Sequence, residues 1–351
     1  MSVKIFKVDR DIEKTTELKQ TYKCLSAKIP KSIGKLVNLQ TLVLSYIQFR
    51  KLPTSIGNLV NLTDLTLCYI QLTKLPKSMS KLINLKNIDL SKNGIKNIEH
   101  LSNLTNLEEL DLYENSLESL PKSMNMINLK ILNCSMNKLK TISESIGNLV
   151  SLKILSFTYN KLQSLPESIG NLVNLKQLCL SDNELVSLPK SIGNLVSLEL
   201  LELQNNKLEL LPDSIGNLVN LGYLYLYDNQ LASLPESIGN LVKLNVLDVS
   251  NNKFTNLPES IFEVSDGYCL KLYNNQFTSL PKSILKLLDL ISIDDTSYEI
   301  NNLSLDCEFL ILSELSVPLE NLPCTIQTIW LNKSITDYQI KVPFGCKIEF
   351  F

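Results

Sequence analysis

Residues 175–190 read LKQLCLSDNELVSLPK, and this stretch decides the fold because its frame returns along most of the chain. With x for any residue, the frame is LxxLxLxxNxLxxLP. It recurs from Leu107 as LEELDLYENSLESLPK, from Leu198 as LELLELQNNKLELLPD and from Leu221 as LGYLYLYDNQLASLPE. Self-similarity at a fixed period of about 20–50 residues is typical of a solenoid, in which each repeat buries its apolar face against its neighbours.

Prolines mark the period of this repeat. Ten of them follow one another at intervals of 23 residues, apart from two intervals of 45: Pro30, Pro53, Pro76, Pro121, Pro166, Pro189, Pro212, Pro235, Pro258 and Pro281. Glu99 and Ser143 stand where each long interval lacks its proline. A solenoid grows one unit at a time, so the 351 residues are predicted to form one solenoid of about twelve coils rather than two globular domains.

Each coil is predicted to contain a short strand followed by an asparagine. Successive strand residues face opposite sides, so Leu178 and Leu180 should lie in the core and the residues between them outside it. An amide both donates and accepts hydrogen bonds. We therefore expect each asparagine to bond the turn of its own coil and the backbone of the next coil. The asparagines are Asn93, Asn115, Asn137, Asn160, Asn183, Asn206, Asn229, Asn252 and Asn275.

The remainder of each coil, LP-x-SIGNLV-x-L, predicts a short 3₁₀ or irregular helical turn on the outer side. Proline lacks an N–H and suits the start of this segment, whereas a central glycine disfavours a regular helix. The glycines are Gly147, Gly170, Gly193, Gly216 and Gly239.

The full frame, LxxLxLxxNxLxxLPxxIGxLxxL, resembles the leucine-rich repeat family, and its 23-residue form with LP resembles the intracellular Ras-group and Scribble-like members. The resemblance covers about residues 25–300, with residues 1–24 as an N-terminal cap and 301–351 as a C-terminal cap. It implies an α/β solenoid, a leucine-rich repeat horseshoe with a parallel concave β-sheet and short 3₁₀ or irregular helical convex segments. Members of this family mostly bind proteins through the concave side.

Several coils depart from the frame. Ile47 and Ile70 occupy the asparagine position and cannot bond the turn, so we expect the ladder to be broken near the N-terminus and that end to be looser or differently curved. In the last coil Tyr298 takes the asparagine position and Asp295 takes the position of a core leucine. A terminal repeat that loses its pattern in this way is expected to become a cap.

The two ends lie outside the 23-residue frame. In residues 1–24, Asp9 or Asp11 is a candidate start of a short helix. Residues 301–351 stay apolar and are expected to cover the last open edge of the sheet, with a separate binding module as the alternative. The fragment ENLPCTIQTIWL resembles the FNIP-type repeats of amoebae and of the large DNA viruses that infect them. The aromatic residues available as a cover are Phe309, Trp330, Phe344, Phe350 and Phe351.

Composition places the chain inside the cell. Hydrophobic residues make up 44% and charged residues 20%, and the net charge of -2 gives no global attraction to nucleic acid or to an anionic membrane. The charged N-terminal stretch is unlike a signal peptide, and no stretch approaches the length of a transmembrane helix, so a cytoplasmic location is predicted. Eight scattered cysteines without a CxxC pair indicate reduced thiols, with Cys134 in a core position.

The sequence favours a non-catalytic protein. The chain has one histidine, His100, and lacks GxxxxGK[ST], HExxH and GxSxG motifs, so we expect no enzyme activity, no cofactor and no metal site. Asp89 and Asp111 fall on neighbouring strands and could form an acid pair or a cation site. A solvated acidic face explains them more simply.

The side chains between the strand leucines should form the concave face. Acids dominate there, with Asp64, Asp89, Glu109, Asp111, Glu114, Asp182, Glu202, Asp228 and Asp248 against Lys92 and Lys271. Three tyrosines fall on one strand, and tyrosine is enriched at binding hot spots, although it is also a common strand residue. The candidate partner-binding residues are Tyr223, Tyr225, Tyr227, Asp248, Glu202, Leu200, Tyr113, Asp111, Tyr159 and Tyr273.

The sequence thus predicts a scaffold or adaptor whose concave face binds a protein partner with a basic or amphipathic segment, without nucleic-acid binding or membrane insertion. The Ras-group resemblance implies a small GTPase or its kinase pathway as one candidate partner. Two alternatives remain open. One is a substrate-recruiting subunit of a ubiquitin ligase, although neither end shows a ligase-docking element, and the other is a structural or self-assembling repeat protein.

Overall fold

The structure is a computed structural model, and it describes residues 2–5, 8–21, 29–47, 49–264, 269–272, 274–276, 290–293, 309–312, 328–331, 342 and 345–350. The chain divides into two compact units, Met1–Leu178 (unit 1) and Cys179–Phe351 (unit 2).

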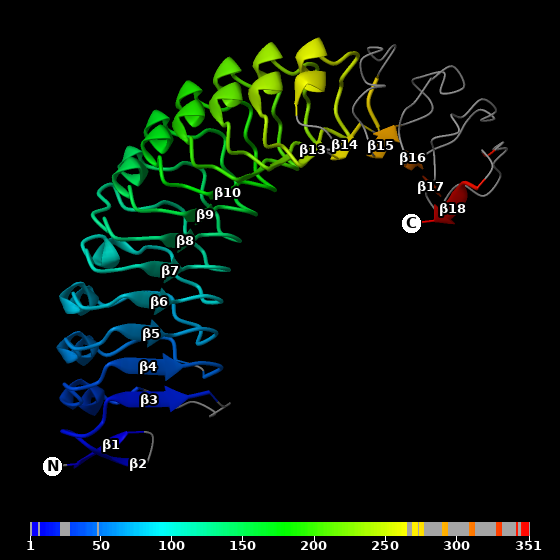
Figure 1. Cartoon of the computed structure of the whole chain (residues 1–351). Coiled ribbons are helices and arrows are strands. Elements are labelled where there is room, and N and C mark those ends of the chain that lie inside the picture. Colours follow the sequence, from blue (N-terminus) through cyan, green and yellow to red (C-terminus); the bar gives the residue numbers. More distant parts are fainter. Residues whose placement is uncertain are drawn as a thin grey trace. The chain divides into compact units, whose positions relative to one another are not determined.

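Unit 1 begins with an antiparallel hairpin and continues as a parallel sheet. The hairpin consists of β1 (Ser2–Ile5) and β2 (Val8–Asp11). Each following strand pairs in parallel with the next one along the chain (Figure 1). These strands are β3 (Glu17–Gln20), β4 (Thr41–Leu44), β5 (Asp64–Thr66), β6 (Asn87–Asp89), β7 (Glu109–Asp111), β8 (Ile131–Asn133) and β9 (Ile154–Ser156).

Unit 2 repeats this arrangement. Its parallel strands are β11 (Leu200–Glu202), β12 (Tyr223–Tyr225), β13 (Val246–Asp248), β14 (Cys269–Lys271), β15 (Leu290–Ile293), β16 (Phe309–Leu312), β17 (Thr328–Leu331) and β18 (Lys347–Phe350). Strand β10 (Gln177–Cys179) spans the division between the units.

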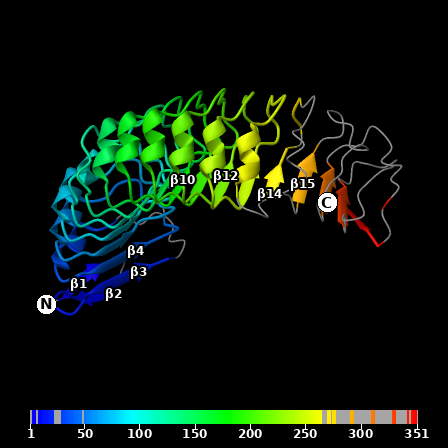
Figure 2. The same ribbon diagram turned by 45° about the horizontal axis from the view of Figure 1, so that its top comes forward.

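In most of the described coils a short 3₁₀ helix lies across the coil from the strand (Figure 2). In unit 1 they are η1 (Lys31–Lys35), η2 (Thr54–Asn58), η3 (Lys77–Lys81), η4 (Glu99–Leu101), η5 (Glu144–Asn148) and η6 (Glu167–Asn171). In unit 2 they are η7 (Lys190–Asn194), η8 (Asp213–Asn217), η9 (Glu236–Asn240) and η10 (Glu259–Glu263). The predicted alternation of short strands with 3₁₀ turns is confirmed.

Proline starts most of these 3₁₀ helices, as the sequence predicts. Pro212, for example, precedes η8 in an extended conformation with φ of -71°. Ser143 takes the same place before η5, where its side chain accepts a hydrogen bond from the Ser145 N–H at 3.3 Å. A hydroxyl can thus stabilise the start of the turn where proline is missing, because it satisfies one of the free N–H groups.

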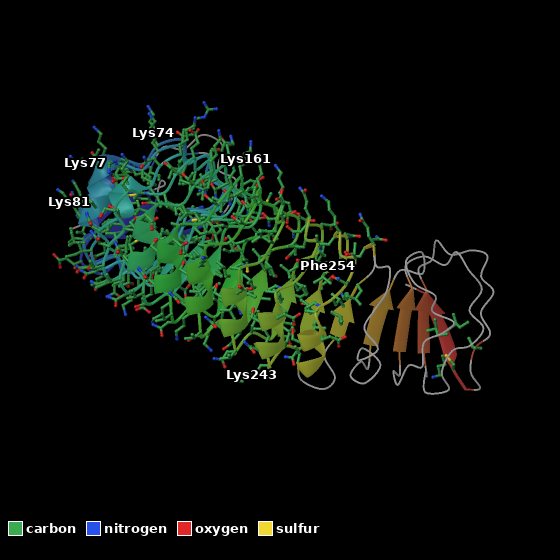
Figure 3. All side chains as sticks on the ribbon, turned by 90° about the horizontal axis from the view of Figure 1, so that it is seen from above. Lys74, Lys77, Lys81, Lys161, Lys243 and Phe254 are labelled. Atoms are coloured by element: carbon green, nitrogen blue, oxygen red, sulfur yellow. The ribbon has the colours of Figure 1, made fainter. Side chains whose placement is uncertain are left out.

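The core is formed by the strand leucines, which alternate along each strand with residues that face out of the core. Leu201 and Leu203 are completely buried, and Cys134 is buried in its leucine position as predicted. Phe157 and Phe254 are the largest buried side chains. Charged side chains such as Lys77, Lys161 and Lys243 extend from the surface (Figure 3).

The regular recurrence of glycine within the 3₁₀ turns has a second cause, which the sequence alone does not reveal. A Cβ atom on Gly216 would lie 2.3 Å from the Ser237 carbonyl oxygen and 2.6 Å from the Ser237 Cβ. The same contact recurs at Gly193 against Ser214 and at Gly239 against Ser260. Glycine therefore allows the backbones of neighbouring coils to approach closely, in addition to disfavouring a regular helix.

The predicted N-terminal helix is wrong. Asp11 ends β2, and its Oδ1 accepts hydrogen bonds from the N–H groups of Glu13, at 2.9 Å, and Lys14, at 3.3 Å. These are the bonds of a helix N-cap, but the chain makes only a single turn over residues 12–14 before it extends again. The chain enters β3, where Leu18 is buried against the sheet.

The domain boundaries stay a prediction. Parallel strand β3 lies within residues 1–24, and β16, β17 and β18 lie within residues 301–351. The predictions for Asp295, Tyr298, Phe344 and Phe351 fall outside the described residues, as do those for the side chains of Phe309, Trp330 and Phe350.

Candidate functional site

The inner face of each unit is the sheet surface formed by residues that flank the central leucine of each strand. In β12, Leu224 is buried, while Tyr223 is exposed and Tyr225 is half-buried. Strands β10 and β11 show the same order, with a buried residue between two half-buried ones. The period-2 pattern therefore predicts correctly which side chains lie on this face.

Asparagine side chains fix the end of each strand. The Asn206 Nδ2 donates to the carbonyl oxygens of Leu180, at 3.0 Å, Leu203, at 3.0 Å, and Gln204, at 3.3 Å. Its Oδ1 accepts from the Leu185 N–H at 3.0 Å. The predicted asparagine ladder is confirmed, but each amide bonds the coil before its own and not the next coil.

Isoleucine interrupts this ladder at the two predicted positions. Ile47 and Ile70 are buried, and no side-chain amide is present at either place. The backbone of the Ile70 coil still bonds the asparagine of the next coil. The Asn93 Oδ1 accepts from the N–H groups of Ile70, at 3.2 Å, and Leu72, at 2.9 Å. That the N-terminal end is looser or differently curved stays a prediction.

The residue before each asparagine has a left-handed backbone. Tyr46 and Tyr69 have the same backbone before Ile47 and Ile70, which take the asparagine position, and Gln71 has it after Ile70. The other described non-glycine residues with positive φ each precede an asparagine: Lys92, Glu114, Met136, Tyr159, Asp182, Asn205, Asp228, Asn251 and Asn274. The N–H of this residue donates to the strand end of the following coil, for example from Asn205 to the Tyr227 carbonyl at 3.0 Å. This conformation turns the chain away from the sheet and ends the strand.

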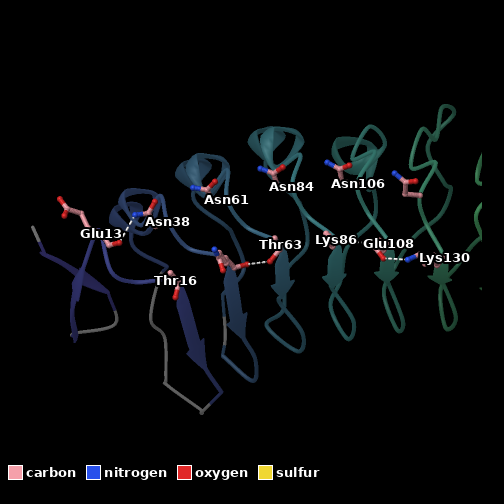
Figure 4. A pocket seen from close by; sticks show the side chains of 12 residues that line it. Glu13, Thr16, Asn38, Asn61, Thr63, Asn84, Lys86, Asn106, Glu108 and Lys130 are labelled. Atoms are coloured by element: carbon pink, nitrogen blue, oxygen red, sulfur yellow. Dashed lines mark hydrogen bonds and ion pairs between the residues drawn. The ribbon is translucent and has the colours of Figure 1, made fainter.

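A second asparagine ladder, which the sequence reading missed, lies beside the sheet of unit 1. The Nδ2 of Asn61 donates to the Val37 carbonyl at 2.9 Å, and that of Asn84 donates to the Val60 carbonyl at 2.8 Å. With Asn38, Asn106 and Asn128 they line a polar groove of about 870 Å³ (Figure 4). The signal is present in the sequence as an Asn-Leu pair that recurs with the coil period.

In unit 2 the candidate residues meet in two rows across the strands. One row pairs Leu200 with Tyr223 and Tyr223 with Val246. The other pairs Glu202 with Tyr225, Tyr225 with Asp248 and Asp248 with Lys271. We call Leu200, Glu202, Tyr223, Tyr225 and Val246 the inner patch. Tyr223 has 42% of its surface exposed and gives the patch its most accessible aromatic ring.

Tyr225 lies at the centre of these charges. Burial raises the pKa of its phenol first, and the charges of Glu202, Tyr223 and Asp248 raise it further, against the opposing effect of Lys271. The phenol therefore stays protonated at neutral pH and can donate a hydrogen bond to a partner.

Asp248 is predicted to present an acid on the concave face, but its side chain is buried. Only 2% of its surface is exposed. Its Oδ1 accepts hydrogen bonds from the Ser250 N–H and hydroxyl, and its Oδ2 forms an ion pair with the Lys271 Nζ at 3.3 Å. The carboxylate is thus occupied within the protein, so Asp248 supports the patch and presents no free charge to a partner.

The third tyrosine of the predicted group, Tyr227, is half-buried beyond the end of β12. Tyr273 lies outside the described residues.

Asp111, Tyr113 and Tyr159 form a separate group because they belong to unit 1. The Asp111 Oδ1 accepts a hydrogen bond from the Tyr113 N–H at 2.8 Å, and the Lys92 Nζ lies 5.9 Å from the centre of the Tyr113 ring. Tyr159 follows β9 with 56% of its surface exposed. Asp64, Asp89, Glu109 and Asp111 also line a pocket of about 310 Å³ on this inner face.

Within the described residues, no group of three His, Cys, Asp or Glu side chains is arranged to hold a metal ion. His100 is half-buried in η4. No helix in the described part of the chain is both long enough and apolar enough to cross a membrane.

Comparisons with known proteins agree with this architecture. The family model for a leucine-rich repeat region matches residues 14–125, 110–210 and 204–322. A leucine-rich repeat protein of Leptospira interrogans is similar in structure, with 28% sequence identity, a TM-score of 0.64 and coverage of 97% of both chains.

An internalin of Listeria monocytogenes has a TM-score of 0.68 at 23% identity, covering 97% of this chain and 88% of its own. A TDR receptor has a TM-score of 0.61 at 26% identity, covering 89% of this chain and 62% of its own. The curated proteins include no significant match. Because the family model matches most of the chain and the solved structures share its coils, this chain belongs to the leucine-rich repeat family.

Proposed function

We propose that this chain is a non-catalytic scaffold or adaptor that binds a basic or amphipathic segment of a protein partner through the inner patch. Leucine-rich repeat proteins generally act as protein-interaction scaffolds. The strand register is the observation that supports the inner patch most directly. It sets Leu200, Tyr223 and Val246 in one row, and Glu202 and Tyr225 in the neighbouring row. This gives an apolar strip next to an acidic and phenolic strip.

Such a surface suits an amphipathic segment. Leu200, Tyr223 and Val246 offer apolar area, while Glu202 can pair with a lysine or arginine of the partner and Tyr225 can donate a hydrogen bond. Tyrosine supplies a large contact area at a low cost in side-chain entropy, which favours it at hot spots. The Ras-group resemblance makes a small GTPase or a kinase of its pathway the first partner to test, inside the cell.

The test is a pull-down from a native lysate with mass-spectrometric readout, comparing the wild type with a Tyr223→Ala/Tyr225→Ala variant. A matched control, Val219→Ala/Val242→Ala, removes exposed side chains of unit 2 from outside the inner patch. Proteins lost only from the tyrosine variant would support the proposal, and a direct titration should then show affinity reduced at least about tenfold.

Equal recovery by both variants would overturn the inner patch as the site. Recovery of no specific protein, together with a large oligomer in size-exclusion chromatography with light scattering, would instead support a structural role.

A further inference from the structure

Positive charge is concentrated in the first coils. Residues 21–86 contain ten lysines and arginines and one acid, Asp64, a net charge of +9 in a chain whose net charge is -2. Asp64 does not face these cations as a free charge, since its carboxylate accepts hydrogen bonds from Asn87 and Thr63 on the inner face. The near-neutral total therefore hides a strongly basic region.

Seven of these cations are exposed and lie away from the inner face. Arg50, Lys51 and Lys74 precede the 3₁₀ turns, and four lysines lie in the turns themselves: Lys31, Lys35, Lys77 and Lys81. None of the seven forms an ion pair within the described part of the chain. Lys74, Lys77 and Lys81 extend from the surface of unit 1 in Figure 3.

The same coils carry an exposed pair of aromatic rings. Tyr46 has 57% and Tyr69 has 54% of its surface exposed, and their ring centres lie 5.2 Å apart with an angle of 36° between the planes. Neither ring contributes to the core. The pair is a ready platform on which a further planar group can stack.

Both tyrosines have a left-handed backbone. Tyr46 has φ of 59° and Tyr69 has φ of 56°, and a bulky residue is rare in this left-handed region. The equivalent residues of unit 2, Asp182, Asn205 and Asp228, are of types that tolerate the region. In the later coils of unit 1, however, the same position holds Lys92, Glu114, Met136 and Tyr159. The left-handed backbone is therefore not peculiar to Tyr46 and Tyr69. What distinguishes the two tyrosines is that their rings contact each other.

Chain length limits how far each ring can lie from one of the charges. Tyr46 is five residues from Lys51, and Tyr69 is five residues from Lys74, so each pair of Cα atoms can be at most about 18 Å apart. We propose that the coils of residues 29–86 bind single-stranded nucleic acid, whose phosphates contact the exposed lysines and Arg50 and whose bases stack on the Tyr46–Tyr69 pair. A cationic track beside a stacking platform is the combination by which proteins hold single strands.

Other anionic partners fit this surface less well. An acidic peptide would use the charges but has no need of an aromatic pair. A membrane would need apolar side chains that insert, and the exposed Val37, Val60 and Ile83 of these coils only repeat a position that is also valine at Val150 and Val173. The predicted absence of nucleic-acid binding rests on the net charge and on the acidic inner face, and neither describes the exposed cations of these coils.

The test uses the full chain and a fluorescein-labelled 20-nucleotide oligo(U), with fluorescence anisotropy measured between 50 and 200 mM NaCl. A Lys51→Glu/Lys74→Glu/Lys77→Glu variant removes three candidate phosphate contacts. We expect its affinity to fall at least about tenfold and the slope of log K against log salt to become shallower by about 2. The control is Lys190→Glu/Lys243→Glu/Lys253→Glu, which makes the same change in net charge in unit 2. It should bind oligo(U) more tightly than the first variant does.

A Tyr46→Ala/Tyr69→Ala variant should weaken binding about tenfold and leave the salt slope unchanged, since stacking releases no counterions. Tyr159→Ala is the matched control, being equally exposed and also left-handed. The proposal is overturned if oligo(U) does not bind at 50 mM NaCl, if the two lysine variants lose affinity equally, or if a duplex binds as well as the single strand. It is also overturned if a polyglutamate peptide or phosphatidylserine vesicles bind more tightly than oligo(U) with the same lysine dependence.

Discussion

In the coils that have one, the asparagine carries several hydrogen bonds that an apolar side chain cannot make. Around Asn206, one amide serves three carbonyl oxygens and one N–H, all drawn from backbone next to the core. A buried backbone group left without a partner costs about 1–3 kcal/mol. The position therefore selects asparagine for stability, with no chemistry required of it.

Replacing Asn206 with alanine should lower the free energy of unfolding by roughly 2–4 kcal/mol, because it leaves the Leu185 N–H and the Leu180 carbonyl without their partner. Chemical denaturation followed by circular dichroism measures the change. Asn217→Ala is the control, since Asn217 is exposed at the end of η8. Equal effects of the two substitutions would contradict the role given to the ladder.

Asp111 predicts a pH-dependent effect on stability. Burial, and then the charge of Asp89, raise the pKa of its carboxyl above the ordinary 3.8, against hydrogen bonds from Tyr113 and Asn133 that lower it. A raised pKa means that the folded chain binds the proton more tightly than the unfolded chain. Ionised Asp111 therefore lowers stability above its folded pKa, and this cost disappears as the pH falls to the unfolded value.

Asp111→Asn keeps the oxygen that accepts from the Tyr113 N–H and removes the charge. We expect Tm to rise by a few degrees or less at pH 7 and the rise to vanish near pH 3, when the wild-type carboxyl is also neutral. Thermal melts across this range check it, with the exposed Glu109→Gln on the same strand as control. A gain that persists unchanged at pH 3 would exclude the electrostatic cause.

At the level of elements, close contact between successive 3₁₀ turns sets the spacing of the coils. Glycine in one turn faces serine in the next, and the serine backbone occupies the volume that a Cβ would need. Gly216→Ala should therefore destabilise the protein by about 1–3 kcal/mol, the usual cost of overpacking. Stability measured by denaturation tests this.

Gly94→Ala is the matched control for Gly216→Ala. A Cβ on Gly94 would meet its nearest neighbour, the Thr73 Cγ2, at 3.5 Å, which is an ordinary contact. This substitution should be neutral or slightly stabilising, because alanine restricts the unfolded chain more than glycine does. If both substitutions destabilise equally, glycine is required for its backbone and not for the contact between coils.

The sequence predicts the elements well where the cause is local. The LxL alternation locates the strands and the buried leucines, and proline locates the start of the 3₁₀ turns. It fails where the cause lies between coils. The direction of the asparagine bonds, the contact of Gly216 with Ser237 and the left-handed residue before each asparagine all depend on how one coil stacks on another.

The candidate site shows the same limit. The strand period predicts that Glu202 and Asp248 are equivalent, and the structure separates them because Ser250 and Lys271 enclose the Asp248 carboxylate. Likewise, β3 contains a single leucine and gave too little pattern to be recognised as a strand.

For the molecule as a whole, stability should be a sum of contacts between neighbouring coils. In Asn206→Ala, hydrogen exchange should accelerate at Leu185, which loses its acceptor, and at the strands on either side, with little change in unit 1. Hydrogen-exchange mass spectrometry resolves this, with Asn217→Ala as control. Equal acceleration throughout both units would mean that the chain opens only as one cooperative body.

The direction of the ladder has a consequence for synthesis. The asparagine of each coil bonds the coil before it, as Asn206 does with Leu180 and Leu185. A chain that emerges from the ribosome N-terminus first cannot complete a coil until the next asparagine has been added, one repeat later. The last coil made therefore lacks the hydrogen bonds that the next asparagine supplies. If translation pauses, this coil stays without them, while the earlier coils already have theirs.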